Sequence, residues 1–194
     1  IDPLMIGVQL AQAWQTIMTR NRDPMDNGVL SITQFHAGSA GNIIPDQATL
    51  EGTVRTFSTD LVDLIERRMR EIAEHTAAAY GALVDFQFAR EYPALINDPL
   101  QAAFATQVLR EMVGTHAVDA QFRPIFAAED FAFMLQQKPG CYVHIGNGGD
   151  SHRAAGHGLG PCQLHNPSYD FNDALLPLGT SFWVKLAEEF LNQT

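Results

Sequence analysis

The chain has 194 residues, of which 46% are apolar and 18% are charged, and its formal net charge is −10 at pH 7. A chain of this length with 12 Phe and 2 Trp can bury a core, which excludes disorder as its main state. The acidic balance excludes a nucleic-acid-binding surface, and no apolar run approaches the roughly 18 residues of a membrane span. Cys141 and Cys162 form no CxxC pair and are interpreted as reduced thiols of a cytoplasmic protein.

Helical and strand patterns alternate over the first ninety residues. Asp2 followed by Pro3 combines an N-cap with a first-turn proline, and apolar residues continue at helical spacing to Ile17. Alternating residues predict strands over 29–36 and 48–57.

A second amphipathic pattern predicts a helix over residues 60–80, ended by Gly81 in the left-handed position, and then a strand over 83–92. The order helix, strand, strand, helix, strand predicts an α+β layer. Its helices would cover one face of a mostly antiparallel sheet.

The second half begins after a boundary at residues 93–98, where Asp98 and Pro99 repeat the helix-start signal of the N-terminus. A loop over residues 147–171, rich in glycine and histidine, is long enough to be functional. The other predicted elements are helices over 98–113, 129–136 and 173–191, the last capped by Asp173, and strands over 123–126 and 141–146.

Two residues on the predicted strands can carry chemistry. His36 ends a strand beside glycines, where an imidazole can donate to a substrate oxygen or, more simply, to the backbone. Arg55 can hold a carboxylate with two parallel hydrogen bonds, or it can pair with Glu51 on the same strand face.

Further candidates lie in the second half. Adjacent Glu129 and Asp130 stand at a predicted helix start, where capping is the simpler interpretation. The long loop holds His152, His157 and His165, which are residues of metal-ligand type, but their spacing fits no closed zinc pattern.

Four segments, taken in this order, resemble one family. They are His-Ala-Gly-Ser-Ala-Gly-Asn-Ile-Ile-Pro at 36–45, Leu-Glu-Gly-Thr-Val-Arg-Thr-Phe at 50–57, Glu-Asp-Phe at 129–131 and Leu-His-Asn-Pro-Ser-Tyr-Asp-Phe at 164–171. Together they are similar to the hippurate hydrolase, or N-acyl-amino-acid amidohydrolase, branch of the dinuclear metallopeptidases, a group that includes aminoacylases and carboxypeptidase G.

The resemblance implies a division of the chain. Residues 1–92 would be an inserted, ferredoxin-like α+β lid that forms a homodimer. Residues 93–194 would be the C-terminal part of an α/β catalytic domain. The N-terminal part of that domain, with the general base and further metal ligands, would be absent from this sequence.

The resemblance also implies roles for four residues. His165 matches the last metal ligand, and its imidazole suits Zn, Mn, Co or Ni. His36 matches a lid histidine that stabilises the oxyanion in the partner's site, Asn42 matches a substrate-binding asparagine, and Arg55 lies where relatives hold a substrate carboxylate. His152, His157, Glu129 and Asp130 receive no assigned role.

The expected function is hydrolysis of the amide bond of an N-acyl (aroyl or acetyl) amino acid by an enzyme with two divalent metal ions. One alternative is a catalytically incompetent fragment that only dimerises or binds a partner. Another is a stand-alone metal-binding module built on the three loop histidines.

Overall fold

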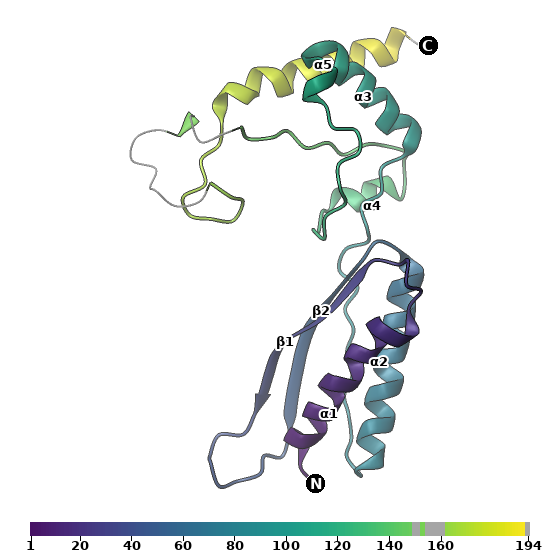
Figure 1. Cartoon of the computed structure of the whole chain (residues 1–194), viewed down its shortest axis with the longest axis vertical. Helices are drawn as coiled ribbons and strands as arrows, with labels where there is room; N and C mark the ends of the chain where they lie inside the picture. The colour runs from purple at the N-terminus through teal and green to yellow at the C-terminus, as the bar shows by residue number, and fades with distance from the viewer. Residues whose placement is uncertain (149–151, 154–161, 193–194) are drawn as a thin grey trace. The chain divides into compact units, whose positions relative to one another are not determined.

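The computed structural model describes residues 1–148, 152–153 and 162–192 (Figure 1). The chain divides into two compact units, which are described separately. The first comprises Ile1–Leu95 and Ile125–Phe133, and the second comprises Ile96–Pro124 and Met134–Thr194. No helix among the described residues is long and apolar enough to cross a membrane.

Two capped helices form one layer of the first unit. Helix α1 (Pro3–Thr16), continued by the π-helical turn η1 (Ile17–Asn21), begins at Asp2, whose carboxylate accepts from the N–H of Leu4 at 3.1 Å. Helix α2 (Thr59–Ala79) begins at Ser58. At its end Gly81 has φ +65°, and the N–H groups of Gly81 and Ala82 donate to the last-turn carbonyls, as the sequence predicts.

The other layer is a two-stranded antiparallel sheet of β1 (Gly28–Ala37) and β2 (Ala48–Thr56). The register pairs Gly28 with Thr56 and Ala37 with Ala48, with a bulge on β1 between Ile32 and Gln34. Next to this bulge β2 carries Gly52, where an added Cβ would lie 2.3 Å from the carbonyl oxygen of Ser31. Only glycine allows this close approach of the two strands.

Both helices pack on the same face of the sheet, as predicted. The buried cluster takes Leu30 from the sheet, and Leu50 and Val54 pack against it from β2. Its helical members are Leu10, Trp14, Ile17, Leu61, Ile65 and Ala73. The intervening residues of β2, including Glu51, Thr53 and Arg55, are exposed on the other face, which fits the alternation of a half-covered sheet.

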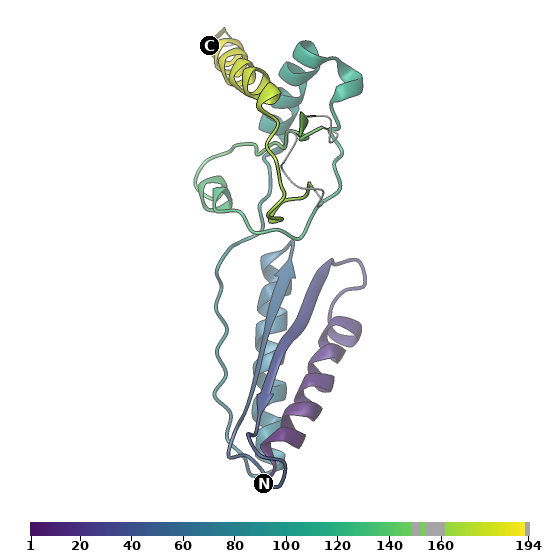
Figure 2. The same ribbon diagram turned by 90° about the vertical axis from the view of Figure 1, so that its left-hand side faces the viewer.

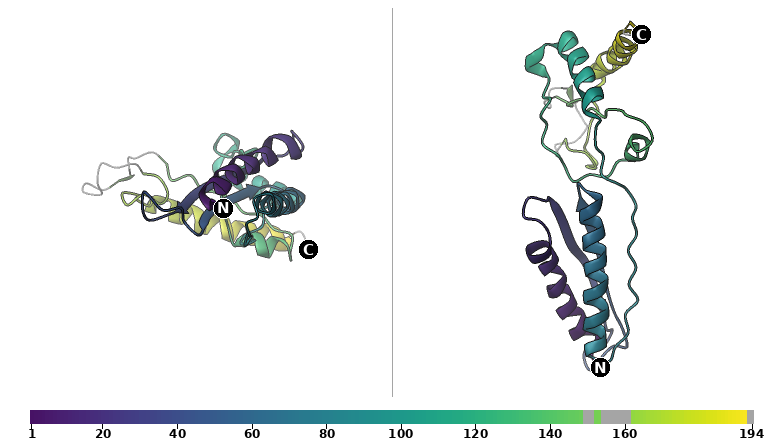
Figure 3. Two further views of the ribbon diagram at one scale, coloured as in Figure 1. Left: turned by 90° about the horizontal axis from the view of Figure 1, so that it is seen from below. Right: turned by 90° about the vertical axis from the view of Figure 1, so that its right-hand side faces the viewer.

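The prediction of a sheet strand over residues 83–92 is wrong. The segment runs extended alongside α2 (Figures 2 and 3), but its backbone forms no ladder with the described residues. Side chains hold it instead. Phe86 meets Trp14 edge-on at 6.3 Å between ring centroids, and the Arg70 guanidinium carbon lies 4.7 Å from the centroid of the Phe86 ring.

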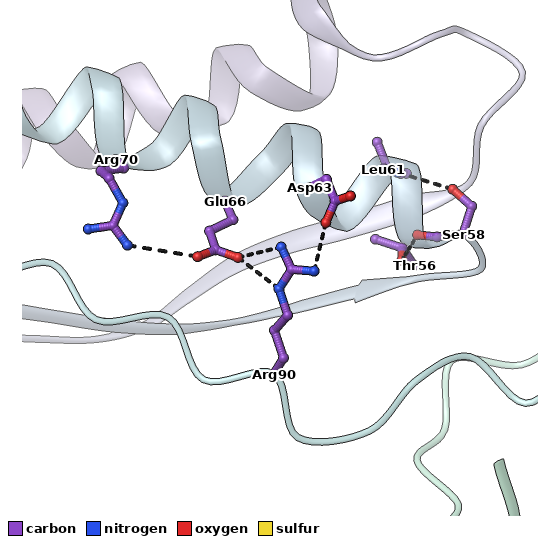
Figure 4. A network of polar contacts seen from close by, with 7 residues as sticks. All are labelled: Thr56, Ser58, Leu61, Asp63, Glu66, Arg70 and Arg90. Atoms are coloured by element: carbon purple, nitrogen blue, oxygen red, sulfur yellow. Dashed lines mark hydrogen bonds and ion pairs between the residues drawn. The ribbon is translucent and has the colours of Figure 1, made fainter. Parts of the chain in front are cut away.

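Arg90 fixes the far end of this segment. Its guanidinium donates to Glu66 at 2.6 and 2.8 Å and pairs with Asp63 at 2.6 Å (Figure 4). Hydrogen bonds to Glu66, and then to Asp63, raise the pKa of Arg90 above its ordinary value. The alternating pattern therefore predicted the extended conformation and the inward face, but not which groups would hold the segment.

The second unit packs α3 (Pro99–Val113) against α5 (Leu176–Asn192) around Ala105, Val108 and Phe182 (Figure 1). Asp98 caps α3 and accepts from two N–H groups at 3.0 Å, as predicted. Its short elements are η2 (Thr115–Ala117) and η4 (Asp173–Leu175), whereas α4 (Phe131–Leu135) is divided between the units after Phe133.

Three predictions for the second half need correction. The side chain that caps η4 before α5 is that of Asn172, which accepts from Ala174 N–H at 3.2 Å, and not that of Asp173. Residues 123–126 and 141–146 are not strands, because neither segment forms a ladder with another described segment. Apolar alternation alone does not supply the partner that a strand requires.

Candidate functional site

His36 lies near the end of β1, on the sheet face that the helices leave uncovered. Its neighbour Phe35 packs against Gly7 of α1, and successive strand residues point to opposite faces. The imidazole is exposed, and its Nε2 lies 3.0 Å from Oε1 of Gln34. The side chain is therefore accessible to a molecule that approaches the open face of the sheet.

Asn42 lies in the loop that joins β1 to β2. Its side chain is exposed and makes no hydrogen bond to another described residue. Ile43 and Ile44 beside it are 66% and 63% exposed. The loop thus presents one free amide beside two apolar side chains.

Arg55 occupies the opposite end of the sheet. Its Nη1 donates to the carbonyl oxygen of Phe126 at 3.1 Å, and the Phe126 ring stacks on Phe57 with centroids 4.4 Å apart. The alternative pairing of Arg55 with Glu51 is not formed among the described residues. The carbonyl takes only one guanidinium nitrogen, so other N–H groups remain available to a ligand.

The backbone positions of His36 and Arg55 lie near opposite ends of the sheet. His36 pairs with Thr49 in the sheet, whereas Arg55 pairs with Val29. Thr49 and Arg55 are six residues apart along β2, which corresponds to about 20 Å. The two side chains therefore lie at separate places on the open face of the sheet.

His165 lies in a tight turn of the second unit. The N–H of Asn166 donates to the carbonyl oxygen of Gln163 at 3.1 Å, and His165 has φ +67°. Positive φ is uncommon for residues other than glycine and is better tolerated by His, Asn and Asp than by most others. The imidazole is exposed and makes no hydrogen bond to the described residues.

The described residues do not assemble a metal site by themselves. They contain no group of three or more His, Cys, Asp or Glu side chains placed to hold an ion. His165 fits one ligand position, because its imidazole is exposed and unpaired among these residues. His152 does not offer the same arrangement, since its Nε2 lies 2.9 Å from the carbonyl oxygen of Asp170. His157 lies outside the described residues.

Glu129 and Asp130 begin α4, in agreement with the simpler interpretation of the sequence. The Glu129 carboxylate accepts from Phe131 N–H at 3.3 Å, and its carbonyl accepts from Ala132 N–H. The Asp130 carbonyl accepts from Phe133 N–H at 3.0 Å. These contacts are those of a helix start.

Sequence reasoning missed the side-chain amides that organise the second unit. Asn97 exchanges two hydrogen bonds with the backbone of Tyr142, at 2.8 and 2.9 Å. Asn147 and Asn172 make a similar pair at the ends of the long loop. In the sequence, only the position of these asparagines at loop boundaries could have indicated this role, because the residues that they bond to are distant along the chain.

The fold agrees with the comparisons to known proteins. The chain belongs to the peptidase family M20/M25/M40, whose family model matches residues 23–189. It is 34% identical to the hippurate hydrolase of Campylobacter jejuni over 98% of this chain and 47% of that protein. It is 32% identical to an N-acetylcysteine deacetylase of Bacillus subtilis over 96% of this chain and 46% of that protein.

Solved structures agree with this assignment. A dinuclear metal binding peptidase of the M20 family from Bacillus subtilis superposes with a TM-score of 0.77 at 30% identity, over 100% of this chain and 47% of that chain. A structure from methicillin resistant Staphylococcus aureus gives a TM-score of 0.79 at 22% identity and supports the fold alone. The chain spans about half the length of the relatives that it matches.

Proposed function

We propose that the protein to which this chain belongs is a metal-dependent amidohydrolase that cleaves the amide bond of N-acyl amino acids, with an aroyl or acetyl group on nitrogen. The observation that carries the proposal is the match of essentially the whole chain to a hippurate hydrolase and a deacetylase. The names of both relatives describe hydrolyses of an N-acyl amino acid. A soluble cytoplasmic enzyme acting on a small molecule belongs to the same proposal.

Residues 1–92 would act as the lid and residues 93–194 as the C-terminal part of the catalytic domain. His165 would donate one imidazole nitrogen to a site for two divalent ions, whose Zn, Mn, Co or Ni identity stays open. Such ions, when bound, supply Lewis acidity to the amide carbonyl and to water. His165 is exposed and makes no hydrogen bond within the described part of the chain, which supports its role.

His36 would act in the site of a partner subunit, where it donates a hydrogen bond to the developing oxyanion. Asn42 would contact the substrate, and Arg55 would hold its carboxylate. The positions of His36 and Arg55 lie about 20 Å apart along the sheet, and a homodimer formed through the lid would let the two residues reach one ligand from different chains.

The test of His165 is His165→Asn in the full-length protein, because Asn also tolerates positive φ and so removes the imidazole without forcing the turn. Changing a partner of a metal ligand costs 10–100-fold, so losing the ligand itself should lower metal affinity and kcat/KM at least about a hundredfold. His75→Asn, at an exposed position of α2, is the matched control. Unchanged metal content and turnover on N-benzoyl and N-acetyl amino acids in His165→Asn would reject the proposal.

The partner-subunit role of His36 has its own test. His36→Asn and His165→Asn proteins, each inactive alone, are unfolded, mixed and refolded together. If His36 acts across the dimer, half of the dimers are mixed and each has one complete site, which restores about a quarter of the activity. No recovery in dimers verified as mixed would place His36 in its own subunit's site.

The alternative, a catalytically incompetent module, is favoured by one observation, namely that the described residues gather no group of three metal-ligand side chains. The deciding sample is the 194-residue chain with its intact mass verified. Hydrolysis by that chain alone would reject the alternative.

A further inference from the structure

The two ends of the loop that carries His165 meet at a pair of asparagines. Asn147 accepts from the N–H of Asn172 at 3.0 Å through its side-chain oxygen, and the Asn172 amide donates to the carbonyl of Asn147 at 3.1 Å. The Asn147 amide nitrogen also donates to the carbonyl of Asp170 at 2.9 Å. Three bonds therefore close the loop at its base, and two of them use the Asn147 side chain.

The same Asn147 nitrogen reaches two more points of the loop. It lies 3.4 Å from Nε2 of His152 and 3.7 Å from Sγ of Cys162. These contacts are longer than the first three and are weaker. Together with the bond to Asp170, they place residues 152, 162 and 170 around the Asn147 side chain.

Residues 162–170 contain two successive turns, and His165 lies in the first. Asn166 N–H donates to the Gln163 carbonyl, and Tyr169 N–H donates to the Asn166 carbonyl at 2.9 Å. The Asn166 side chain also accepts from the N–H and the hydroxyl of Ser168. Because both ends of this segment are held at Asn147, the two turns leave a single backbone conformation for His165.

The left-handed backbone at His165 needs this support. A non-glycine residue keeps such a conformation only where the surrounding structure holds it. A loop released at its base could exchange this turn for unstrained ones, and the imidazole would then point in several directions.

We propose that Asn147 is a positioning residue that holds the loop of His165 so that the imidazole is presented in a single orientation. The consequence for metal binding rests on the function proposed above for His165. The amide is required because one group must both accept from Asn172 N–H and donate to the Asp170 carbonyl. A carboxylate can only accept, and an apolar side chain can do neither.

The test uses Asn147→Ala and Asn147→Asp in the full-length protein, with Asn97→Ala as the matched control. Asn97 also makes two side-chain bonds to backbone in the same unit, but to Tyr142 and not to the loop. Hydrogen exchange is followed at the amides of Asn172 and Tyr142, and metal affinity is measured by titration of the apoprotein with Zn²⁺ or Mn²⁺.

Asn147→Ala should exchange the Asn172 amide about tenfold faster, because its acceptor is lost, whereas Asn147→Asp keeps that acceptor and loses only the bond to the Asp170 carbonyl. Their metal affinity should fall about 10–100-fold, as for other groups that orient a metal ligand. Asn97→Ala should speed exchange at Tyr142 and leave Asn172 and metal affinity unchanged. Asn147→Asp keeps the side-chain volume and serves if Asn147→Ala does not fold.

Unchanged exchange at Asn172 in Asn147→Ala, or unchanged metal affinity in either folded Asn147 variant, would overturn the proposal. An equal loss of metal affinity in Asn97→Ala would also overturn it, because the effect would then be general destabilisation. Failure of the proposed function is separately visible, since His165→Asn would then bind metal normally.

Discussion

The first unit buries seven side chains in one connected cluster under two helices and a sheet, whereas the main cluster of the second unit buries Ala105, Val108 and Phe182. Among its described residues, the second unit relies more visibly on bonds from side-chain amides to backbone, at Asn97, Asn147 and Asn172. Apolar burial stabilises a whole unit, because every member of the cluster contacts several others. A side-chain amide that is bonded to backbone fixes only the segment that it contacts.

The two candidate histidines are therefore positioned by different kinds of interaction. His36 sits in a strand whose register is set by the ladder and by the buried face behind it. His165 sits in a turn whose course is set by a few side-chain bonds. Substitutions in the first unit should therefore change global stability, and those near His165 should change local order.

The largest effect is expected from Ile65→Ala, which removes a fully buried side chain from the centre of the first cluster. Transfer and cavity costs together should lower the free energy of unfolding by about 3 kcal/mol. Trp14 lies in this cluster, so its fluorescence during urea unfolding in a Trp183→Phe background reports on this unit alone. Ile43→Ala, at an exposed loop position, is the control and should stay within about 0.5 kcal/mol.

Equal urea midpoints for Ile65→Ala and Ile43→Ala would contradict this contrast between the two units. They would mean that the cluster does not carry the stability of the first unit.

A smaller loss is expected from Gly52→Ala on β2. The new methyl group would lie 2.3 Å from the carbonyl oxygen of Ser31, and a paired backbone cannot move away easily. We expect a loss of about 2 kcal/mol, together with a disturbed β1 next to His36. Gly41→Ala is the control, because an added Cβ there has no neighbour within 4 Å.

Thermal unfolding and hydrogen exchange along β1 measure both glycine variants. If Gly52→Ala matches Gly41→Ala in both, the close contact at the bulge is not what sets the register of the strand that holds His36.

The smallest expected effect concerns Cys141 of the second unit. Burial against the α3 and α5 cluster raises the pKa of Cys141 above its ordinary value. Because the thiolate is the reactive form, alkylation of Cys141 should be slower at pH 7 than that of a cysteine peptide, and its rate should rise at a higher pH. Peptide mapping separates Cys141 from Cys162.

Alkylation of Cys141 in urea should follow the cysteine peptide. If the pH profile of Cys141 alkylation in the native protein already matches that of the peptide, water reaches this cluster freely. Apolar burial would then contribute even less to the stability of the second unit than we infer.

The sequence by itself determined the features that depend on near neighbours. Asp2 with Pro3 and Asp98 with Pro99 begin helices, and Gly81 ends one, because each acts on N–H or carbonyl groups within a few residues. The alternation in β2 likewise determined which residues face the core, since strand side chains point to opposite faces whatever the partner is. The four ordered motifs also carried the family resemblance, which the comparisons confirm.

Only the tertiary structure decided the features that depend on distant partners. Residues 83–92 are extended but have no strand partner among the described residues, Arg55 donates to Phe126, and Asn147 closes the loop of His165. A strand needs a neighbouring backbone, and an amide or guanidinium takes whichever acceptor the fold brings within about 3 Å. Local sequence patterns give the type of side chain available for such bonds, but the chain must fold before its partner is chosen.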